Sequence, residues 1–301
     1  MRYSGEREKE LLMLKNNKLL DSSQVHVSAM DPAFLYGESL VTTVGVTRGH
    51  PEFLDRHLDR ILQMANSLDW SFIPSRGDLL HGVSMLLENL ESPPKLLRIT
   101  MTPGALREVS LTGKPSVQGD WFIFPVFRND PPKSDWEHGV DVALAPDPLL
   151  LSGDPRGRLK TGNLLLSAHL ARRKPKGVYE WILKGRTGRL LEGAVSNVFF
   201  IRDDGTVFTA PERWGILPGV IRCVVLEEWK KEGRILRWSA PKSSELGQVK
   251  GIFLTNSYLK VMPVARLLDE KGGVLWEGSP SWLKEEILPL RERIEIRSAR
   301  E

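Results

Sequence analysis

Two adjacent prolines in a polar stretch, residues 128–135, divide the 301-residue chain into two parts. The stretch reads Arg-Asn-Asp-Pro-Pro-Lys-Ser-Asp, and proline both fixes its own backbone and disfavours a helix at the residue before it. Patterns typical of strands and helices precede this stretch and restart after it. Because one hydrophobic core rarely serves more than about 250–300 residues, the sequence predicts two domains joined by a linker over residues 129–137.

The two expected domains differ in size. A polar extension covers residues 1–10, a smaller N-terminal domain residues 11–128, and a larger C-terminal domain residues 138–301. Apolar residues at three- and four-residue steps predict helices, and short apolar runs between turn residues predict strands. The helices are expected over 54–69, 78–90, 163–173 and 282–294 and after Gly219, and the strands over 11–20 (a hairpin), 96–102, 120–127, 140–145, 179–183, 195–201 and 252–255. Both domains are therefore expected to be mixed α/β (α+β).

Composition excludes several classes of protein. Hydrophobic residues make up 41% of the chain and charged residues 27%, as in ordinary globular proteins. The longest apolar run, residues 121–127, is far shorter than the roughly 20 residues of a membrane-spanning helix. Residues 1–10 are charged and lack the apolar segment of a secretory signal. The single cysteine, Cys223, cannot form an intramolecular disulfide, so we expect a reducing, cytoplasmic location without a membrane partner.

Charge and histidine spacing point away from nucleic acids and metals. The formal net charge of +4 is too small to select a partner. The basic clusters at 172–176 and 230–231 lack interleaved aromatic residues, so they fit solvated helix ends better than a nucleic-acid surface. The six histidines show no metal-ligand spacing, and we expect no metal site. Phosphate-loop, dinucleotide-binding and nucleophile-elbow motifs are also absent from the sequence.

Two segments of the second half interrupt these ordinary patterns. Residues 192–199, Glu-Gly-Ala-Val-Ser-Asn-Val-Phe, place a carboxylate before small and polar residues and then return to a hydrophobic strand. Residues 216–222, Ile-Leu-Pro-Gly-Val-Ile-Arg, form an apolar turn that opens a helix with glycine at its start. The N–H groups at such a start carry partial positive charge, which suits a phosphate. Upstream, residues 158–163 place Lys160 at a strand-to-helix junction.

In order and spacing, these segments resemble the signature of the class IV pyridoxal-phosphate-dependent aminotransferase family, fold type IV. The matching positions are Glu192, Asn197, Val198, Phe199, Val207, Thr209, Leu217, Gly219, Val220 and Arg222. The resemblance continues in residues 31–38, 57–60 and 253–257 and spans residues 11–275. It implies an enzyme with the two-domain fold of D-amino acid aminotransferases, a pyridoxal 5'-phosphate cofactor and a homodimer.

The resemblance assigns the catalytic role to Lys160. Its amine would hold the cofactor as a Schiff base and later move the proton at the reacting carbon. Glu192 resembles the carboxylate that keeps the pyridine nitrogen protonated, so that the ring withdraws electrons. Taken alone, Lys160 would be a surface lysine and Glu192 half of a surface ion pair. Their joint order and spacing favour the family roles.

The cofactor phosphate has its own expected ligands. Arg60, the N–H groups of Val220 and Ile221, and Thr255 resemble the family's phosphate-binding residues. The family often has Ile-Thr where this chain has Val220-Ile221, so we expect backbone donors alone at that place. Thr255 and the Asn256 that follows it also fit a turn whose side chains bond their own backbone.

The substrate residues are less clearly marked. The candidates are Tyr36, Thr43, Arg107 and Asn256. In the loop 102–107, Pro103 stands where the family often has an arginine, which leaves Arg107 to pair with a substrate carboxylate. An exposed loop arginine without that role is an equally good interpretation. The expected partner is a small anionic molecule, either an amino acid or aminodeoxychorismate.

Pocket motifs favour one reaction within the family. Residues 254–257 and 261–264, together with Thr42 and Thr43, resemble aminodeoxychorismate lyases, and the chain lacks the Gly-Thr-Ala of branched-chain enzymes. The leading hypothesis is therefore a lyase that converts 4-amino-4-deoxychorismate to 4-aminobenzoate and pyruvate for folate synthesis. The alternative is an aminotransferase for a D-amino acid or a branched-chain amino acid. A non-catalytic binding protein on the same scaffold is a remote third possibility.

Overall fold

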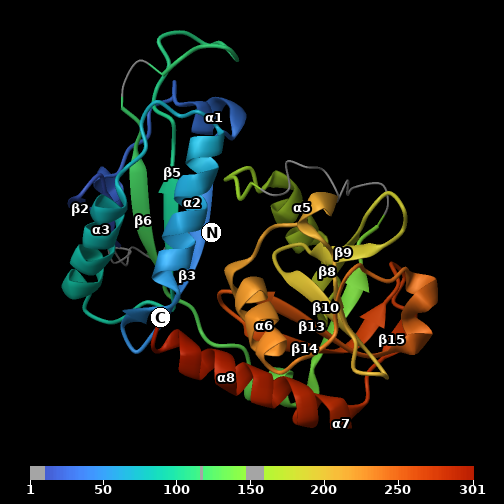
Figure 1. Ribbon diagram of the computed structural model, residues 1–301. Helices are drawn as coiled ribbons and strands as arrows, with labels where there is room; N and C mark the ends of the chain where they lie inside the picture. The colour runs from blue at the N-terminus through green and yellow to red at the C-terminus, as the bar shows by residue number, and fades with distance from the viewer. Residues whose placement is uncertain (1–10, 116–117, 147–158) are drawn as a thin grey trace, which may run out of the picture. The chain divides into compact units, whose positions relative to one another are not determined.

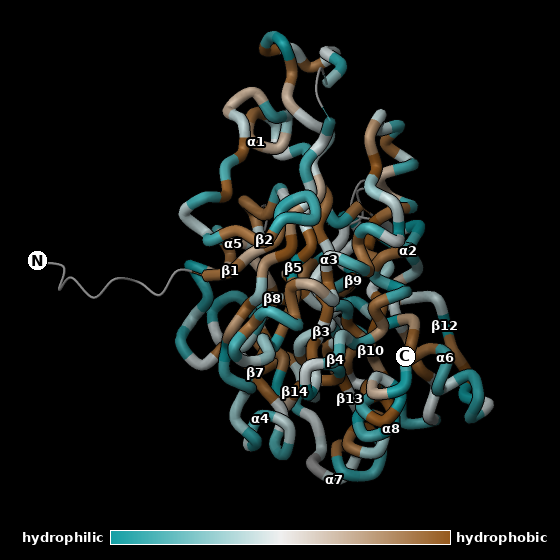
Figure 2. Tube along the Cα trace, turned by 90° about the vertical axis from the view of Figure 1, so that its left-hand side faces the viewer, coloured by the Kyte–Doolittle hydropathy of each residue, from teal (hydrophilic) through white to brown (hydrophobic). Residues whose placement is uncertain are grey.

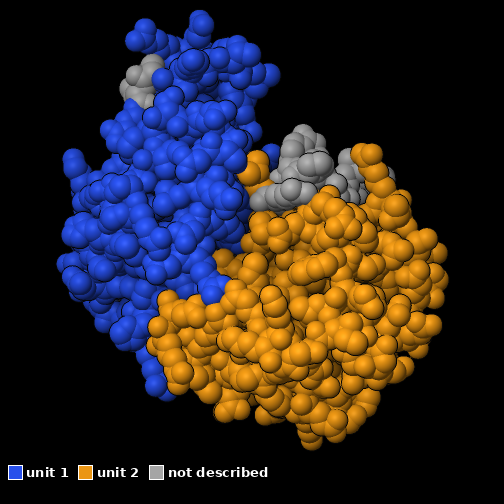
Figure 3. Space-filling model, viewed as in Figure 1, with its two compact units in different colours: residues 1–129, 160–163 blue, residues 130–159, 164–301 orange. Residues whose placement is uncertain are grey.

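The computed structural model describes residues 11–115, 118–146 and 159–301. Contacts between Cα atoms divide the chain into two compact units (Figures 1 and 3). Unit 1 comprises residues 1–129 and 160–163, and unit 2 comprises residues 130–159 and 164–301. The chain therefore returns to unit 1 for four residues that the sequence pattern placed in the C-terminal domain. The second half of the expected linker belongs to the short helix α4 (Lys133–His138), whose Trp136 is buried in the core of unit 2.

Unit 1 is built on a six-stranded sheet with the order β2-β1-β6-β5-β3-β4, in which all neighbours are antiparallel. The strands are β1 (Leu12–Lys15), β2 (Lys18–Asp21), β3 (Leu40–Thr47), β4 (His50–Pro51), β5 (Leu96–Met101) and β6 (Trp121–Val126). The helices are η1 (Ser22–Gln24), α1 (Pro32–Tyr36), α2 (Leu54–Ser67) and α3 (Arg76–Asn89). Helix α2 packs on β3, and α3 packs on β1 and β6.

The apolar periodicity of the sequence explains both long helices of unit 1. Helix α2 buries Leu58, Ile61 and Ala65 at three- and four-residue steps, as predicted. Helix α3 begins two residues before the expected start. Ser75 is its N-cap, and its hydroxyl accepts the N–H of Asp78 while the Asp78 carboxylate accepts the N–H of Ser75. Asp78 is thus the second half of a capping box and not the cap itself.

Unit 2 contains a nine-stranded sheet with the path β12-β11-β10-β13-β14-β7-β8-β9. Strand β15 pairs with β14, and β9 also pairs with β10, so that the sheet closes on itself. The strands are β7 (Val140–Leu144), β8 (Val178–Lys184), β9 (Leu190–Gly193), β10 (Asn197–Arg202), β11 (Val207–Thr209), β12 (Leu236–Trp238), β13 (Val249–Asn256), β14 (Lys260–Leu268) and β15 (Val274–Glu277). The mixed α/β class expected for both halves is confirmed.

The helical elements of unit 2 include α4, described above, and several later segments. These are α5 (Leu165–Arg173), η3 (Glu212–Trp214), α6 (Val220–Lys231), η4 (Ser243–Gln248), α7 (Pro280–Trp282), the π-helical turn η5 (Leu283–Ile287) and α8 (Leu288–Ser298). The C-terminal helix expected over 282–294 is therefore longer than predicted and contains a π turn. No helix in the described part of the chain combines the length and apolarity needed to cross a membrane.

Both faces of the central strands in unit 2 are buried, which explains the long hydrophobic stretches along them (Figure 2). Val198 and Phe200 of β10 point into the main core with Leu254 of β13. On the opposite face, Phe199 and Phe253 stack with ring centroids 4.8 Å apart, and Trp229 of α6 meets both edge-on. Helix α6 is thereby held against β10 and β13, close to the ends of the strands that carry the candidate site.

Candidate functional site

The side chains of Glu192 and Asn197 both form hydrogen bonds with the backbone of Leu217 in unit 2. They are direct partners across β9 and β10. The Glu192 carboxylate accepts the N–H of Leu217 at 3.1 Å, and the Asn197 Nδ2 donates to the carbonyl of Leu217 at 2.8 Å. Leu217 lies two residues before the N-cap of α6. Two strand ends therefore fix the turn that opens this helix.

The start of α6 offers backbone donors at that place. The helix begins at Val220 with Gly219 as N-cap, its first turn holds no acidic residue, and no described side chain caps it. The first N–H groups of a helix lack intrahelical acceptors and carry partial positive charge. Gly219 is required here, because a Cβ on it would lie 2.1 Å from Asn197 Oδ1. The helix start predicted at Val220 and Ile221 is confirmed.

Arg222 secures the same helix from its other side. Its guanidinium is 1% exposed and donates to the carbonyl of Ala210 at 3.0 Å and to Glu212 at 3.1 Å. It also lies over the Trp238 ring, 5.4 Å from the centroid. Burial lowers the pKa of this guanidinium from its ordinary value. Arg222 thus ties α6 to the segment after β11 and has a structural function.

Thr255 adds a hydroxyl to the group. It lies on β13 directly opposite Asn197, is 1% exposed, and its Oγ1 has no hydrogen-bond partner among the described residues. A buried polar group without a partner costs about 1–3 kcal/mol, so an orphaned hydroxyl beside the helix N–H groups fits an anionic oxygen. Together with the Glu192 carboxylate, these donors fit a phosphorylated cofactor that carries a ring nitrogen.

Asn256 uses its polar atoms within the protein. Its Oδ1 accepts the N–H groups of Tyr258 at 3.0 Å and Leu259 at 2.8 Å, and its Nδ2 donates to Ser196 Oγ at 2.9 Å. The carboxamide therefore builds the turn between β13 and β14, as the second interpretation of the sequence allowed. A role in substrate binding stays a prediction.

Lys160 is held by the backbone of unit 1. Its carbonyl accepts the N–H of Val41 at 2.8 Å, and its own N–H donates to Met64 Sδ at 3.2 Å. Thr161 bridges Leu40 of β3 in antiparallel fashion. The lysine therefore lies beside β3, directly before an isolated β-bridge, and its N–H contacts Met64 of α2.

Arg60 lies in unit 1 on α2. Its Nη2 donates to the Thr42 hydroxyl at 2.9 Å, and that hydroxyl lies 2.8 Å from His57 Nδ1. Thr42 and His57 are fully buried. The guanidinium is thus oriented by a strand residue and by a histidine one helical turn away on its own helix. Unit 1 holds Lys160 and Arg60, while unit 2 holds Glu192 and Thr255.

A family model described as amino-transferase class IV matches residues 39–267. The chain belongs to the class IV aminotransferase family. The predicted family, fold and enzyme class are confirmed: this class IV protein is a pyridoxal-phosphate-dependent enzyme of the aminotransferase or lyase kind. Its cofactor is pyridoxal 5'-phosphate, for which the residues described above provide fitting donors.

Relatives of this class IV enzyme have different activities. A D-alanine aminotransferase of Bacillus licheniformis is 24% identical over 277 residues, 91% of this chain and 94% of that protein. An aminodeoxychorismate lyase of Bacillus subtilis strain 168 is 25% identical over 263 residues, covering 84% and 85%. The crystal structure of a branched-chain aminotransferase from Thermoproteus uzoniensis has a similar fold, with a TM-score of 0.78, 19% identity and 96% coverage of each chain. Family membership therefore leaves the reaction open.

The structure adds one candidate residue that the sequence reasoning missed. Arg98 of β5 is half-buried and lies directly opposite Thr43 of β3. Its Nε donates to the Thr100 hydroxyl at 3.4 Å, and no described carboxylate pairs with it. Burial lowers the pKa of the guanidinium. The sequence feature that could have indicated this residue is a cation within the otherwise apolar run Leu-Leu-Arg-Ile, residues 96–99.

For the other predicted substrate residues of this class IV enzyme, the structure gives the position and the exposure of each side chain. Tyr36 ends α1 and is half-buried, and Thr43 is half-buried on β3. Arg107 is exposed in the loop after β5, although its neighbour Leu106 is buried and donates its N–H to the Met30 carbonyl. Their roles stay predictions.

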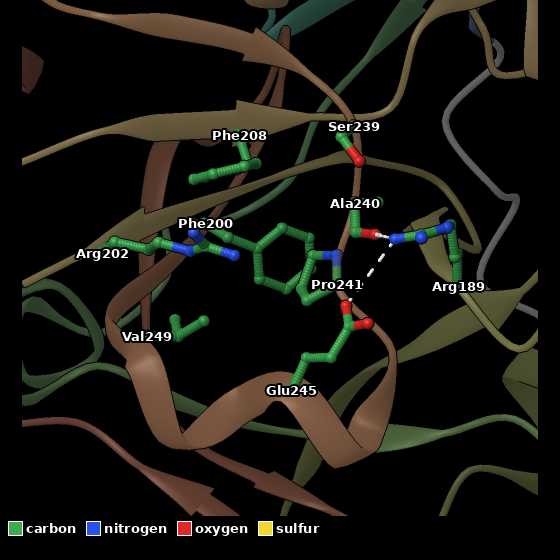
Figure 4. Close-up of a pocket in the computed structure, with 9 residues that line it drawn as sticks. All are labelled: Arg189, Phe200, Arg202, Phe208, Ser239, Ala240, Pro241, Glu245 and Val249. Carbon is green, nitrogen blue, oxygen red and sulfur yellow. Dashed lines mark hydrogen bonds and ion pairs between the residues drawn. The ribbon is translucent and has the colours of Figure 1, made fainter.

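A small cavity in unit 2 lies apart from these residues (Figure 4). It has a volume of about 40 Å³ and is lined by Arg189, Phe200, Arg202, Phe208, Ser239, Ala240, Pro241, Glu245 and Val249. Ligand pockets usually measure about 300–1,000 Å³, so this cavity is too small for a cofactor. Arg189 donates to the Ala240 carbonyl at 2.5 Å and lies 3.6 Å from Glu245, which closes one side.

Proposed function

We propose that this class IV enzyme is an aminodeoxychorismate lyase that converts 4-amino-4-deoxychorismate to 4-aminobenzoate and pyruvate. The observation that carries the cofactor part of the proposal is the orphaned hydroxyl of Thr255, buried opposite Asn197 beside the start of α6. The lyase part is supported by residues 254–257 and 261–264 and by the Thr42-Thr43 pair, and by a relative of that activity.

In this proposal the phosphate is held by residues of three kinds. Thr255 supplies a hydroxyl, Val220 and Ile221 supply backbone N–H groups, and Arg60 supplies a cation that Thr42 orients. Such a set combines a full charge with fixed dipoles, which suits a dianion. When bound, pyridoxal 5'-phosphate supplies an aldehyde for the substrate amine and a ring that withdraws electrons.

Glu192 and Lys160 carry the chemistry of the chain itself. The Glu192 carboxylate, fixed by the Leu217 N–H, would pair with the pyridine nitrogen of the cofactor and keep it protonated. The Lys160 amine would hold the cofactor and, when free, would remove the proton from the ring carbon that bears the substrate amine. The enolpyruvyl group would leave from the neighbouring position as the ring becomes aromatic, and uptake of a proton would convert it to pyruvate. The reaction needs no second substrate.

The substrate of this reaction is an amine with two carboxylates. Arg98 matches it, because its half-buried guanidinium lacks a described acidic partner and lies opposite Thr43. We assign one carboxylate to Arg98 and the other to Arg107, with Tyr36, Thr43 and Asn256 completing the substrate contacts. Guanidinium groups bind carboxylates in a bidentate manner, so two of them would favour a dianion over a monoanionic amino acid.

The second candidate function is an aminotransferase for a D-amino acid or a branched-chain amino acid. It is favoured by the D-alanine aminotransferase of Bacillus licheniformis, which this chain matches over 91% of its length. Such an enzyme requires a keto acid to accept the amino group, whereas the lyase does not. We further propose that the protein is a cytoplasmic homodimer. Sedimentation equilibrium of the purified protein tests the dimer.

One experiment separates the candidates. The protein is reconstituted with pyridoxal 5'-phosphate and given aminodeoxychorismate without any keto acid, and 4-aminobenzoate and pyruvate are measured together. We expect both products in equal amounts over many turnovers, and Lys160→Ala should yield neither and lose the visible absorbance of the bound cofactor. Amino-group exchange between an amino acid and a keto acid, with no 4-aminobenzoate, would establish the aminotransferase instead.

A further inference from the structure

A buried carboxylate of unit 2 lies beside the cofactor residues without belonging to them. Glu180 of β8 is 5% exposed. Its Oε1 accepts the N–H of Val195 at 2.7 Å, and its Oε2 accepts the hydroxyl of Ser196 at 2.8 Å. Burial raises the pKa of this carboxyl, and hydrogen bonds from the Val195 N–H and from the hydroxyl and N–H of Ser196 oppose that rise. Gly193 accommodates the carboxylate, because a Cβ there would lie 2.3 Å from Glu180 Oε1.

The chemistry of the groups fixes the direction of the hydrogen bonds. The Ser196 hydroxyl donates to Glu180 Oε2, so its lone pairs are left to accept from Asn256 Nδ2 at 2.9 Å. The amide nitrogen of Asn256 must then face Ser196, and its oxygen must face the N–H groups of Tyr258 and Leu259. Glu180, acting through Ser196, and these two N–H groups together fix the orientation of the Asn256 amide.

This chain of hydrogen bonds joins the two strands that carry the candidate phosphate site. Ser196 immediately precedes Asn197 on β10, and Asn256 immediately follows Thr255 on β13. Asn197 and Thr255 are direct partners across these strands. The Ser196–Asn256 bond therefore clamps the strand ends beside the orphaned hydroxyl of Thr255.

We propose that Glu180 is a positioning residue that, through Ser196 and Asn256, sets the place of the Thr255 hydroxyl and so the affinity for the cofactor phosphate. The inference rests on the cofactor part of the proposed function. It does not depend on which reaction the enzyme performs.

Each hydrogen bond in this chain has a donor and an acceptor, and a substitution of Glu180 can reverse the direction of the bond to Ser196. In Glu180→Gln, the single amide oxygen is needed by the Val195 N–H, so the amide nitrogen must donate to Ser196 Oγ. The Ser196 oxygen then accepts from both amide nitrogens through its two lone pairs, and its own hydroxyl proton is left without an acceptor in this chain of hydrogen bonds. We expect the dissociation constant for pyridoxal 5'-phosphate to rise about tenfold, as for the loss of one charged buried hydrogen bond. Ser196→Ala breaks the chain in the middle and should weaken binding similarly.

The partner substitution Asn256→Asp makes the test specific. It turns the Asn256 donor into an acceptor, so Ser196 would face acceptors on both sides in the single variant but would be satisfied when Glu180→Gln is added. The double variant should therefore bind the cofactor more tightly than Asn256→Asp alone, although Glu180→Gln weakens binding in the wild-type background. A purely structural role of Glu180 would shift affinity in the same direction in both backgrounds.

The measurement is an absorbance titration of the cofactor-free full-length protein with pyridoxal 5'-phosphate. Glu52→Gln is the matched control, because Glu52 is 3% exposed in unit 1 and accepts the Thr47 hydroxyl, and it should leave the affinity unchanged. Unchanged affinity in Glu180→Gln and Ser196→Ala, or the absence of the sign reversal, overturns the inference. A wild-type protein that takes up no cofactor would instead overturn the proposed function.

Discussion

At the scale of single residues, the candidate site is marked by polar groups that the protein does not satisfy by itself. Thr255 keeps a buried hydroxyl without a described partner, and Arg98 keeps a half-buried cation without a described acid. By contrast, the amide of Asn256 and the carboxylate of Glu180 have partners on every polar atom. We propose that residues of the first kind bind a ligand and that those of the second kind hold the structure around it.

Thr255→Val tests this distinction, because valine has the shape of threonine without its hydroxyl. In the cofactor-free protein, removing an unsatisfied buried hydroxyl should leave the melting temperature unchanged or raise it. Cofactor affinity should fall about tenfold, since one hydrogen bond to a charged phosphate is lost. Thr255→Ser, which keeps the hydroxyl, is the control for affinity. A fall in stability without a change in affinity would show that the hydroxyl serves the fold.

At the scale of helices and strands, the start of α6 depends on a close approach between two elements. Gly219 must lie against the side chain of Asn197, which itself holds the carbonyl of Leu217. Helix α6 is further packed by Trp229 on the Phe199–Phe253 pair. The helix start is therefore fixed at one end by polar contacts and along its length by aromatic packing.

Gly219→Ala should disturb this arrangement at one point. Its methyl group would overlap Asn197 Oδ1, and overpacking of this kind costs about 1–3 kcal/mol. We expect a lower free energy of unfolding by chemical denaturation together with weaker cofactor binding. Gly247→Ala is the control, because a Cβ at residue 247 would meet no atom within 4 Å and the backbone there is not left-handed. Equal effects of both substitutions would contradict the proposed close approach.

The C-terminal helix α8 is joined to α6 by ion pairs. Arg297 contacts Glu227 at 2.6 Å and Glu228 at 2.8 Å. Although burial opposes it, hydrogen bonds from Lys231 and Arg297 lower the pKa of Glu228. A carboxyl whose pKa is lowered by folding stabilises the fold above its unfolded pKa, and that contribution is lost as the pH falls. The melting temperature should therefore decrease below about pH 4.5.

Arg297→Gln provides the check on this pH dependence. It removes the cation, so the melting temperature should fall at neutral pH and change less between neutral and acid pH than in the wild-type protein. Arg76→Gln serves as the comparison, because Arg76 forms exposed ion pairs with Asp55 and Asp59 in unit 1. Exposed pairs contribute about 0–1 kcal/mol. An unaltered pH profile in Arg297→Gln would place the acid sensitivity elsewhere.

At the scale of the whole molecule, the predicted cofactor residues are divided between the two units. Unit 1 contains Arg60 and Lys160, and unit 2 contains Glu192, Val220 and Thr255. A ligand that contacts residues of both units stabilises both when it binds the folded chain. The cofactor should therefore act on the unfolding of the entire protein.

Calorimetry with and without pyridoxal 5'-phosphate tests this expectation. At a free concentration about one hundred times the dissociation constant, binding adds about 2.7 kcal/mol to the free energy of unfolding. The cofactor should raise the unfolding temperature of both units. Hydrogen exchange with and without the cofactor should show, segment by segment, increased protection in both units. Protection confined to unit 2 would show that Arg60 and Lys160 do not contribute to binding.

Local patterns predicted much of the fold, because periodicity and turn residues report on neighbours along the chain. Helix α2 and the start of α6 follow from the spacing of apolar residues and from Gly219. Local patterns do not predict non-local pairing, such as the isolated β-bridge between Leu40 and Thr161. Glu180 was missed for the same reason, since in sequence it is one polar residue within a strand and its partners lie 15 and 16 residues away.

Because residues 160–163 belong to unit 1, the chain passes between the two units more than once, and the units are not joined by a single hinge. The backbone passes from unit 1 to unit 2 after residue 129, returns to unit 1 at residues 160–163, where Thr161 bridges Leu40, and leaves again at residue 164. A cut at the proline-rich segment would therefore separate residues 160–163 from the rest of unit 1. The two fragments would restore that unit only if the segment that carries Lys160 docked again beside β3.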